Sequence, residues 1–150
     1  MFDFSAYGSA LRGEDRLYGG NKFYVDTIPP TAFFSNLRAL MSQYEWKKLS
    51  EYTRKRAGGR CEICSSDRRP EAHERWSFDA STRVQKLERL MCLCKACHLG
   101  THWGLTSHLG FTEEIEAHIL KVTGWSKQEF SSHLKDRSAS IATGASWVLD

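Results

Sequence analysis

The sequence lacks the long apolar segments that membrane-spanning and secreted proteins need. Uncharged apolar runs such as Leu90 to Cys94 cover only five residues, whereas a membrane-spanning helix needs about 20. Residues 1–30 carry four acidic side chains and no apolar leader segment, so we expect no secretory signal. The sequence therefore predicts a cytoplasmic protein that makes no contact with a membrane.

Internal repeats, low-complexity tracts and the composition of a disordered chain are absent as well. Apolar residues make up 41% and aromatic residues 12% of the 150 residues, which is enough to build a packed core. Domains of about 100–150 residues are the commonest size, so a chain of this length is most simply one domain. Its oligomeric state is left open by the sequence.

A strong net charge is also lacking, but the charge is unevenly distributed. The 21 Lys and Arg exceed the 18 Asp and Glu by three, yet residues 38–99 alone hold fourteen basic and eight acidic side chains. A basic segment suits a polyanionic partner such as DNA, and a solvated helix face is the alternative. The basic side chains before the first cysteine pair that we predict to bind nucleic acid are Lys47, Lys48, Arg54, Lys55 and Arg56.

The cysteines argue against a disulfide framework, because there are five and four of them form two Cys-x-x-Cys pairs. In a reducing compartment this spacing indicates a metal site, and a closed site of four thiolates most often holds tetrahedral Zn²⁺. Four free thiols in the core are the alternative. The fifth cysteine, Cys92, is expected to be buried without binding metal. The predicted structural zinc ligands are Cys61, Cys64, Cys94 and Cys97.

Turn and capping signals predict how the chain is organised. The Ile-Pro-Pro at residues 28–30 bars a helix and indicates an extended N-terminal arm packed along the domain. Ser42 and Glu45 have the spacing of a capping box, and the helix that they open is expected to end at the glycines 58 and 59.

Alternating side chains predict a hairpin in the middle of the chain, with strands over residues 71–79 and 84–93. Helix caps and apolar spacing predict the elements after it. These are a helix over residues 95–103 closed by Gly104, a helix with Thr112 as N-cap, a helix from Ser126 to about Lys135, and a closing strand over residues 147–149.

Three histidines stand at positions that favour a second metal site. His98 and His102 are four residues apart, so on a helix they share a face and can converge on one ion. His73 approaches from the first predicted strand, where a structural role is the alternative. The remaining histidines stand outside this pattern and are expected on the surface or in the core; they are His108, His118 and His133.

The cysteine pairs, the strand histidine and the Leu-Cys-x-x-Cys-His at residues 93–98 together resemble the HNH endonuclease family of the small, zinc-stapled, four-cysteine type. The site of that family is a ββα-metal (His-Me) finger, and the resemblance covers roughly residues 41–104. His73, Arg89 and His98 stand at the spacing of the family's His, Asn and His. More loosely, the chain looks like small bacterial or phage HNH-type proteins in which the Asn position is often relaxed.

This resemblance implies an α+β fold with a zinc-stapled ββα-metal core and flanking helices. The implied division is an arm over residues 1–40, an HNH-like domain over residues 41–105, and a C-terminal helical extension over residues 106–150 packed on the same domain.

The implied activity is metal-dependent hydrolysis of DNA phosphodiester bonds. His73 would be the general base that deprotonates the attacking water. His98, helped by His102, would hold a divalent ion, Mg²⁺ or another, at the scissile phosphate. Arg75 or Arg89 would clamp a phosphate oxygen through a bidentate fork.

Two positions depart from the family pattern. Arg89 stands where the family has Asn, and an arginine cannot accept hydrogen bonds as an amide does. Ala72 stands where the family often has an acidic metal ligand, which leaves Glu74 or Glu71 as substitutes; strict alternation places Glu71 on the face of His73. The alternative function is a catalytically inactive HNH-like zinc module that binds nucleic acid or a protein partner, for example a phage-type inhibitor or regulator.

Overall fold

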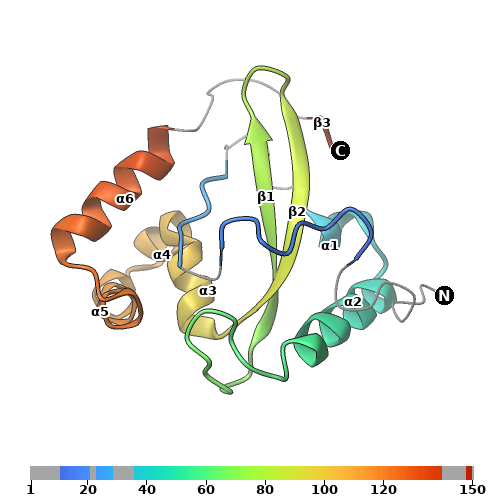
Figure 1. Cartoon of the computed structure of the whole chain (residues 1–150), viewed down its shortest axis with the longest axis horizontal. Helices are drawn as coiled ribbons and strands as arrows, with labels where there is room; N and C mark the ends of the chain where they lie inside the picture. The colour runs from blue at the N-terminus through green and yellow to red at the C-terminus, as the bar shows by residue number, and fades with distance from the viewer. Residues whose placement is uncertain (1–10, 21–22, 29–35, 140–147, 150) are drawn as a thin grey trace.

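The computed structural model describes residues 11–20, 23–28, 36–139 and 148–149 of the chain. Helices flank a small sheet, so the fold is α+β as expected (Figure 1). The elements in chain order are α1 (Leu37–Leu40), α2 (Gln43–Arg56), β1 (Glu71–Asp79), β2 (Val84–Leu93), α3 (Lys95–Thr101), α4 (Trp103–Leu109), α5 (Thr112–Thr123), α6 (Lys127–Ala139) and β3 (Val148–Leu149).

The two central strands form the antiparallel hairpin that the alternation predicts, and both have the predicted bounds. Their pairing runs from Glu71 opposite Leu93 to Asp79 opposite Val84. A bulge follows Arg75, and bulges increase the local twist of a strand. The short β3 pairs with the start of β2 in parallel.

The two faces of the hairpin pack against different parts of the chain. Figure 1 shows α1 and α2 on one side of the hairpin and α3 to α6 on the other. Glu71 and His73 point to the side of α3 and the arm. Glu74 points to the other side, where its carboxylate accepts the backbone N–H of Leu37 at the start of α1. Alternation along β1 therefore decides which side chains meet α3.

The caps of α2 lie where the sequence predicts them. Ser42 and Glu45 make both hydrogen bonds of a capping box. Gly58 follows the last turn at a φ of +65°, a backbone conformation that favours glycine. The inner face of the helix buries Leu49 and Thr53, and the Thr53 hydroxyl donates to the Leu49 carbonyl. The basic side chains are left for the rest of the helix surface.

The single helix predicted over residues 95–103 is two helices. His102 has a φ of −91° and a ψ of 51°, which ends α3 and precedes α4. Gly104 consequently lies inside α4 rather than closing a helix. The backbone N–H of His102 still donates to the carbonyl of His98 at 3.0 Å. The break therefore keeps these two histidines one helical turn apart.

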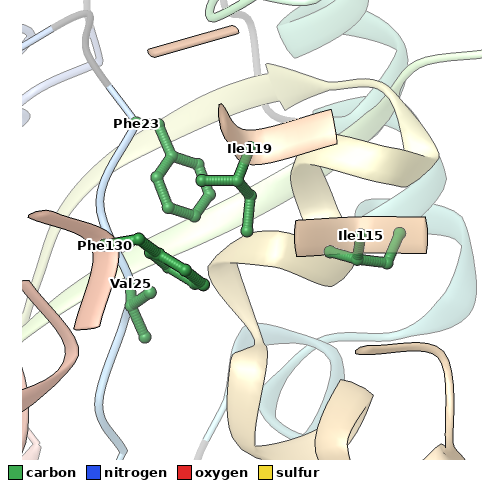
Figure 2. Close-up of a cluster of buried hydrophobic side chains, with 5 residues drawn as sticks. All are labelled: Phe23, Val25, Ile115, Ile119 and Phe130. Atoms are coloured by element: carbon green, nitrogen blue, oxygen red, sulfur yellow. The ribbon is translucent and has the colours of Figure 1, made fainter. Parts of the chain in front are cut away.

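The arm and the last helices close a shared hydrophobic core. Figure 2 shows Phe23 and Val25 of the arm, Ile115 and Ile119 of α5, and Phe130 of α6 packed together, all of them buried. Burial of apolar side chains is the main stabilising contribution to a fold. The arm is thereby fixed between the hairpin and the C-terminal helices.

Two boundaries near the end of the chain differ from the prediction. Thr112 is the first residue of α5 rather than its N-cap, and α6 continues to Ala139, beyond its predicted end. The capping box of Ser126 and Glu129 is confirmed, with hydrogen bonds of 2.7 and 3.1 Å. Position 147 of the predicted closing strand and the two prolines of the arm lie outside the described residues.

Candidate functional site

The four cysteines of the two pairs lie in one cluster, as their spacing predicts. Cys61 and Cys64 come from the segment after α2, and Cys94 and Cys97 from the start of α3. Their sulfur atoms all lie within 4.8 Å of one another, and those of Cys64 and Cys94 are 3.6 Å apart. Four such sulfurs are positioned to bind one metal ion, consistent with structural zinc. Cys92 is fully buried as expected and is not part of the cluster.

Three of the clustered thiols, those of Cys61, Cys94 and Cys97, influence how easily each of them ionises. Hydrogen bonds from Cys94 and Cys97 lower the pKa of Cys61. The hydrogen bond between Cys61 and Cys94 raises the pKa of Cys94 to about 11. Hydrogen bonds with Cys61 and Cys94, together with burial, raise the pKa of Cys97. Crowded thiols resist ionising together, and a divalent ion bound to the thiolates removes that resistance.

His118 of α5 contacts the cysteine cluster, although its position in the sequence gives no sign of this. Its Nε2 atom lies 3.2 Å from the Sγ of Cys97, and burial lowers its pKa. A neutral imidazole can donate its N–H to a thiolate, as partners of metal ligands commonly do. His118 thus links α5 to the cysteine cluster.

A second cluster consists of the three histidines that the sequence analysis singled out. His73 comes from β1, His98 from α3 and His102 from the junction of α3 and α4. One ring nitrogen of each lies within 4.8 Å of the others, and the Nε2 atoms of His98 and His102 are 3.2 Å apart. The ring centroids are separated by 4.9 to 5.1 Å. The three imidazoles therefore converge as ligands of one ion would.

Two of the three histidines, His98 and His102, are held in the state that binds metal. Burial, followed by the neighbouring His73, lowers the pKa of His98. Burial and both neighbouring histidines lower that of His102 to about 3. Neutral imidazoles are the form that ligates a metal. Neither His98 nor His102 has to lose a proton at neutral pH before it binds an ion.

Glu71 orients one of these rings. Its Oε2 atom lies 3.1 Å from the Nδ1 of His98, so the Nδ1–H donates to the carboxylate and Nε2 is left facing His102. The Glu71 side chain is 61% exposed. Glu71 therefore lies at the histidine cluster, on the face of β1 that alternation predicts for it and for His73.

Asp26, from the arm, is a member of this site that the sequence analysis missed. Its Oδ2 atom lies 2.5 Å from the Nε2 of His73, and its backbone N–H donates to the carbonyl of Thr101 on α3. The two side chains are 47 positions apart, and no motif spacing connects them. Only the packing of the arm against the hairpin brings them together.

Glu74, a predicted metal ligand, is not brought to the cluster. Its Oε2 accepts the Nε1–H of Trp76 at 2.9 Å and the backbone N–H of Leu37 at 3.0 Å. Both partners lie on the side of the hairpin that faces α1. The carboxylate joins α1 to the hairpin instead of facing the histidines.

Arg75 and Arg89 lie opposite each other on the hairpin, and both are buried, with 0% and 1% of their surface exposed. Their Nη1 groups donate to the carbonyls of Tyr18 and Gly20 at 3.1 to 3.5 Å. Arg89 also donates to Glu62 at 3.4 Å. The prediction that Arg75 or Arg89 clamps a phosphate is therefore wrong, because both guanidinium groups hold the arm and neither reaches the surface.

The basic helix presents only part of the predicted surface. Arg56 is not available to a partner, because its guanidinium pairs with both carboxylate oxygens of Glu14 at 2.5 and 2.7 Å and donates to the Leu90 carbonyl. Arg54 is half-buried. The predicted contacts that are exposed are Lys47, Lys48 and Lys55.

Among the described residues, none of the helices combines the length and the apolar character that crossing a bilayer demands. The chain matches no protein-family model, no curated protein and no solved structure.

Proposed function

We propose that the protein is a metal-dependent endonuclease of the HNH type that hydrolyses DNA phosphodiester bonds at the histidine cluster. The observation that carries the proposal is the convergence of His73, His98 and His102 from a strand and a helix. The cysteine cluster, which includes Cys94 and Cys97 at the start of that same helix, supports its position. Three ligands on a ββα unit leave positions on an ion open to a substrate, as a catalytic site requires.

The donor atoms favour a transition metal over Mg²⁺. Imidazole nitrogens suit Zn²⁺, Ni²⁺, Co²⁺ or Fe²⁺, whereas Mg²⁺ prefers an octahedral set of oxygens. A divalent ion held here would act as a Lewis acid on the phosphate oxygen and lower the pKa of the attacking water. We therefore expect activity to be supported by Mn²⁺, Co²⁺, Ni²⁺ or Zn²⁺ before Mg²⁺.

The geometry favours His73 as a ligand rather than as the general base expected from the sequence. Its side chain is 1% exposed, and a general base must reach the water that it deprotonates. Glu71 contacts the cluster through His98 and is 61% exposed. We assign to Glu71 the orientation of His98 and the acceptance of the proton from the attacking water.

The test is cleavage of supercoiled plasmid DNA by the zinc-loaded protein with Mn²⁺, Co²⁺ or Ni²⁺ added. We expect nicking that falls by at least about 100-fold in His102→Ala, since removal even of a metal ligand's partner lowers affinity or activity 10- to 100-fold. His108→Ala is the matched control, because His108 is exposed on α4. Absence of nicking with every ion, or equal nicking by His102→Ala and the unchanged protein, would overturn the proposal.

A second candidate function is a zinc module that binds nucleic acid or a protein partner without cutting DNA. Arg89 favours it, because the residue at the family's Asn position is buried and occupied in holding the arm. It predicts that DNA is bound with equal affinity by the unchanged protein and by His102→Ala, and is nicked by neither.

A further inference from the structure

We propose that Asp26 of the N-terminal arm is a positioning residue of the histidine cluster, because its carboxylate accepts the Nε2–H of His73 and leaves the opposite ring nitrogen, Nδ1, to bind the ion. The inference rests on the proposed metal site and deepens it. It names the nitrogen through which His73 binds the ion and the segment of the chain that selects this nitrogen.

Asp26 contacts the cluster through His73. Its Oδ2 atom lies 2.5 Å from the Nε2 of that ring. Among the described residues, the ligand atoms that lie within 4.8 Å of one another here belong to the three histidines, and Asp26 is not a member of this group. An ionised carboxylate only accepts hydrogen bonds, so Nε2 of His73 carries the proton and is not free to bind an ion. The nitrogen of His73 that remains for the ion is Nδ1.

The two carboxylates at the cluster select opposite ring nitrogens. Glu71 lies 3.1 Å from Nδ1 of His98, which leaves Nε2 of that ring for the ion. Asp26 occupies Nε2 of His73 instead. The side chain of Glu71 is 61% exposed and that of Asp26 only 6%, and a hydrogen bond to a charged group is stronger where water is excluded. Asp26 therefore fixes its ring more firmly than Glu71 does.

Arg75 supplies the positive charge that the buried carboxylate of Asp26 needs. Its Nε atom lies 3.9 Å from the Oδ1 of Asp26, and its side chain is 0% exposed. Burial of an unpaired charge is costly, so the guanidinium offsets the cost of burying Asp26 beside His73. A hydrogen bond from a metal-binding imidazole to a carboxylate raises the basicity of the ring and strengthens its bond to the ion.

The backbone of the arm holds Asp26 in place. The N–H of Asp26 donates to the carbonyl of Thr101 on α3 at 3.0 Å. The neighbouring Val25 accepts a hydrogen bond from Arg137 at 2.7 Å and donates one to His133 at 3.0 Å, both on α6. A residue that orients a metal ligand is effective only where its own position is fixed. The arm is thereby part of the metal site without contributing a ligand.

The first test is the affinity for Co²⁺ of protein whose cysteine cluster is loaded with zinc. We expect the unchanged protein to bind one further ion. Asp26→Asn keeps an oxygen that accepts the Nε2–H but loses the charge, and should bind the ion about tenfold more weakly. Asp26→Leu, of similar size but without an acceptor, should bind it about 100-fold more weakly.

The same two substitutions at Asp15, which lies exposed on the same arm, are the matched controls and should stay within about twofold of the unchanged protein. An unchanged affinity in Asp26→Leu would overturn the inference. Equal losses in Asp26→Asn and Asp26→Leu would overturn it as well, because the hydrogen-bond acceptor would then make no difference.

The second test identifies the ligating nitrogen. Nitrogen-15 NMR of the imidazoles distinguishes a nitrogen that carries a proton from a bare one and from one that binds a metal. With only the cysteine cluster loaded, we expect His73 to carry its proton on Nε2. After a second equivalent of Zn²⁺, His73 should bind through Nδ1 and His98 through Nε2. A contact that only held the arm would not decide this, and binding through Nε2 of His73 would overturn the inference.

The outcomes also separate the role of Asp26 from the proposed function. If the unchanged protein binds a second ion and nicks DNA, but His73 binds through Nε2 or Asp26→Leu binds the ion as tightly, the proposed function stands and the positioning role of Asp26 falls. If no second ion binds at all, both fall.

Discussion

The cysteine cluster and the histidine cluster share α3, yet they depend on the rest of the chain in different ways. Cys94 and Cys97 open the helix, and their partners come from one short segment near residue 61. His98 and His102 end the same helix, but they meet His73 of β1, whose ring in turn contacts Asp26 of the arm. The cysteine cluster is therefore built from two local motifs, whereas the histidine cluster is complete only when distant segments pack together.

Removal of a zinc ligand should have the largest effect. Cys61→Ala is expected to reduce retained zinc by one ion per chain and to abolish cooperative unfolding, because a structural zinc contributes about 10–16 kcal/mol in small zinc folds, as much as a whole domain's stability. Metal analysis and thermal denaturation measure both. The matched control Cys92→Ala removes a buried thiol outside the cluster and should keep its zinc. If Cys61→Ala folds and unfolds as the unchanged protein does, loss of a cysteine ligand does not have the largest effect, and the comparison between the two clusters fails.

The arm that contacts the histidine cluster through Asp26 is anchored by Glu14. Burial opposes ionisation of this carboxyl, but hydrogen bonds from Arg56 and from the backbone N–H groups of Leu11 and Leu90 outweigh it, so its pKa is lowered. Glu14→Gln breaks the buried pair with Arg56 and should lower the free energy of unfolding by about 3–5 kcal/mol. Urea denaturation at pH 7 measures this, and Glu45→Gln, at an exposed cap, should cost less than half as much.

The lowered pKa of Glu14 also predicts a pH dependence. A carboxyl with a lower pKa in the folded state contributes stability that is present above its unfolded pKa of about 4.3 and is lost as the pH falls through the folded value. The unchanged protein should therefore lose more stability than Glu14→Gln between pH 5 and the folded pKa. Equal acid profiles in urea denaturation would contradict the role of this pair.

Substitution of Gly100 on α3 tests how closely the arm must approach this helix. A Cβ atom there would lie 2.9 Å from the ring of Phe23 and 3.1 Å from the side chain of Ile119. Gly100→Ala should destabilise by about 1–3 kcal/mol through overpacking, despite the gain of up to about 1 kcal/mol in helix propensity. Gly104→Ala on α4, where a Cβ meets nothing within 4 Å, should instead stabilise. Equal shifts in the midpoint of urea denaturation would show that the arm tolerates displacement.

The same contrast explains what the sequence could predict. Both strands, the capping boxes and the four-cysteine cluster follow from periodicity and spacing, which act over a few residues. Asp26 could not be found that way, because its meeting with His73 depends on tertiary packing. The family resemblance and the residue type predict that Arg75 or Arg89 binds phosphate, but burial beneath the arm is not visible in the sequence. Only alternation along β1 distinguished Glu71 from Glu74.

The smallest effect is expected at the exposed lysines of α2. Figure 1 shows this helix and α3 on opposite sides of the hairpin. Combined substitution by alanine of Lys47, Lys48 and Lys55 should leave folding unchanged and weaken DNA binding about equally across sequences. Each phosphate contact contributes about 0.9 to the slope of log K against log salt concentration, so the slope should fall by at most about three. Lys121→Ala with Lys135→Ala, both exposed on α5 and α6, is the control and should not alter it. An unchanged slope in the α2 variant would show that the basic residues are only a solvated face.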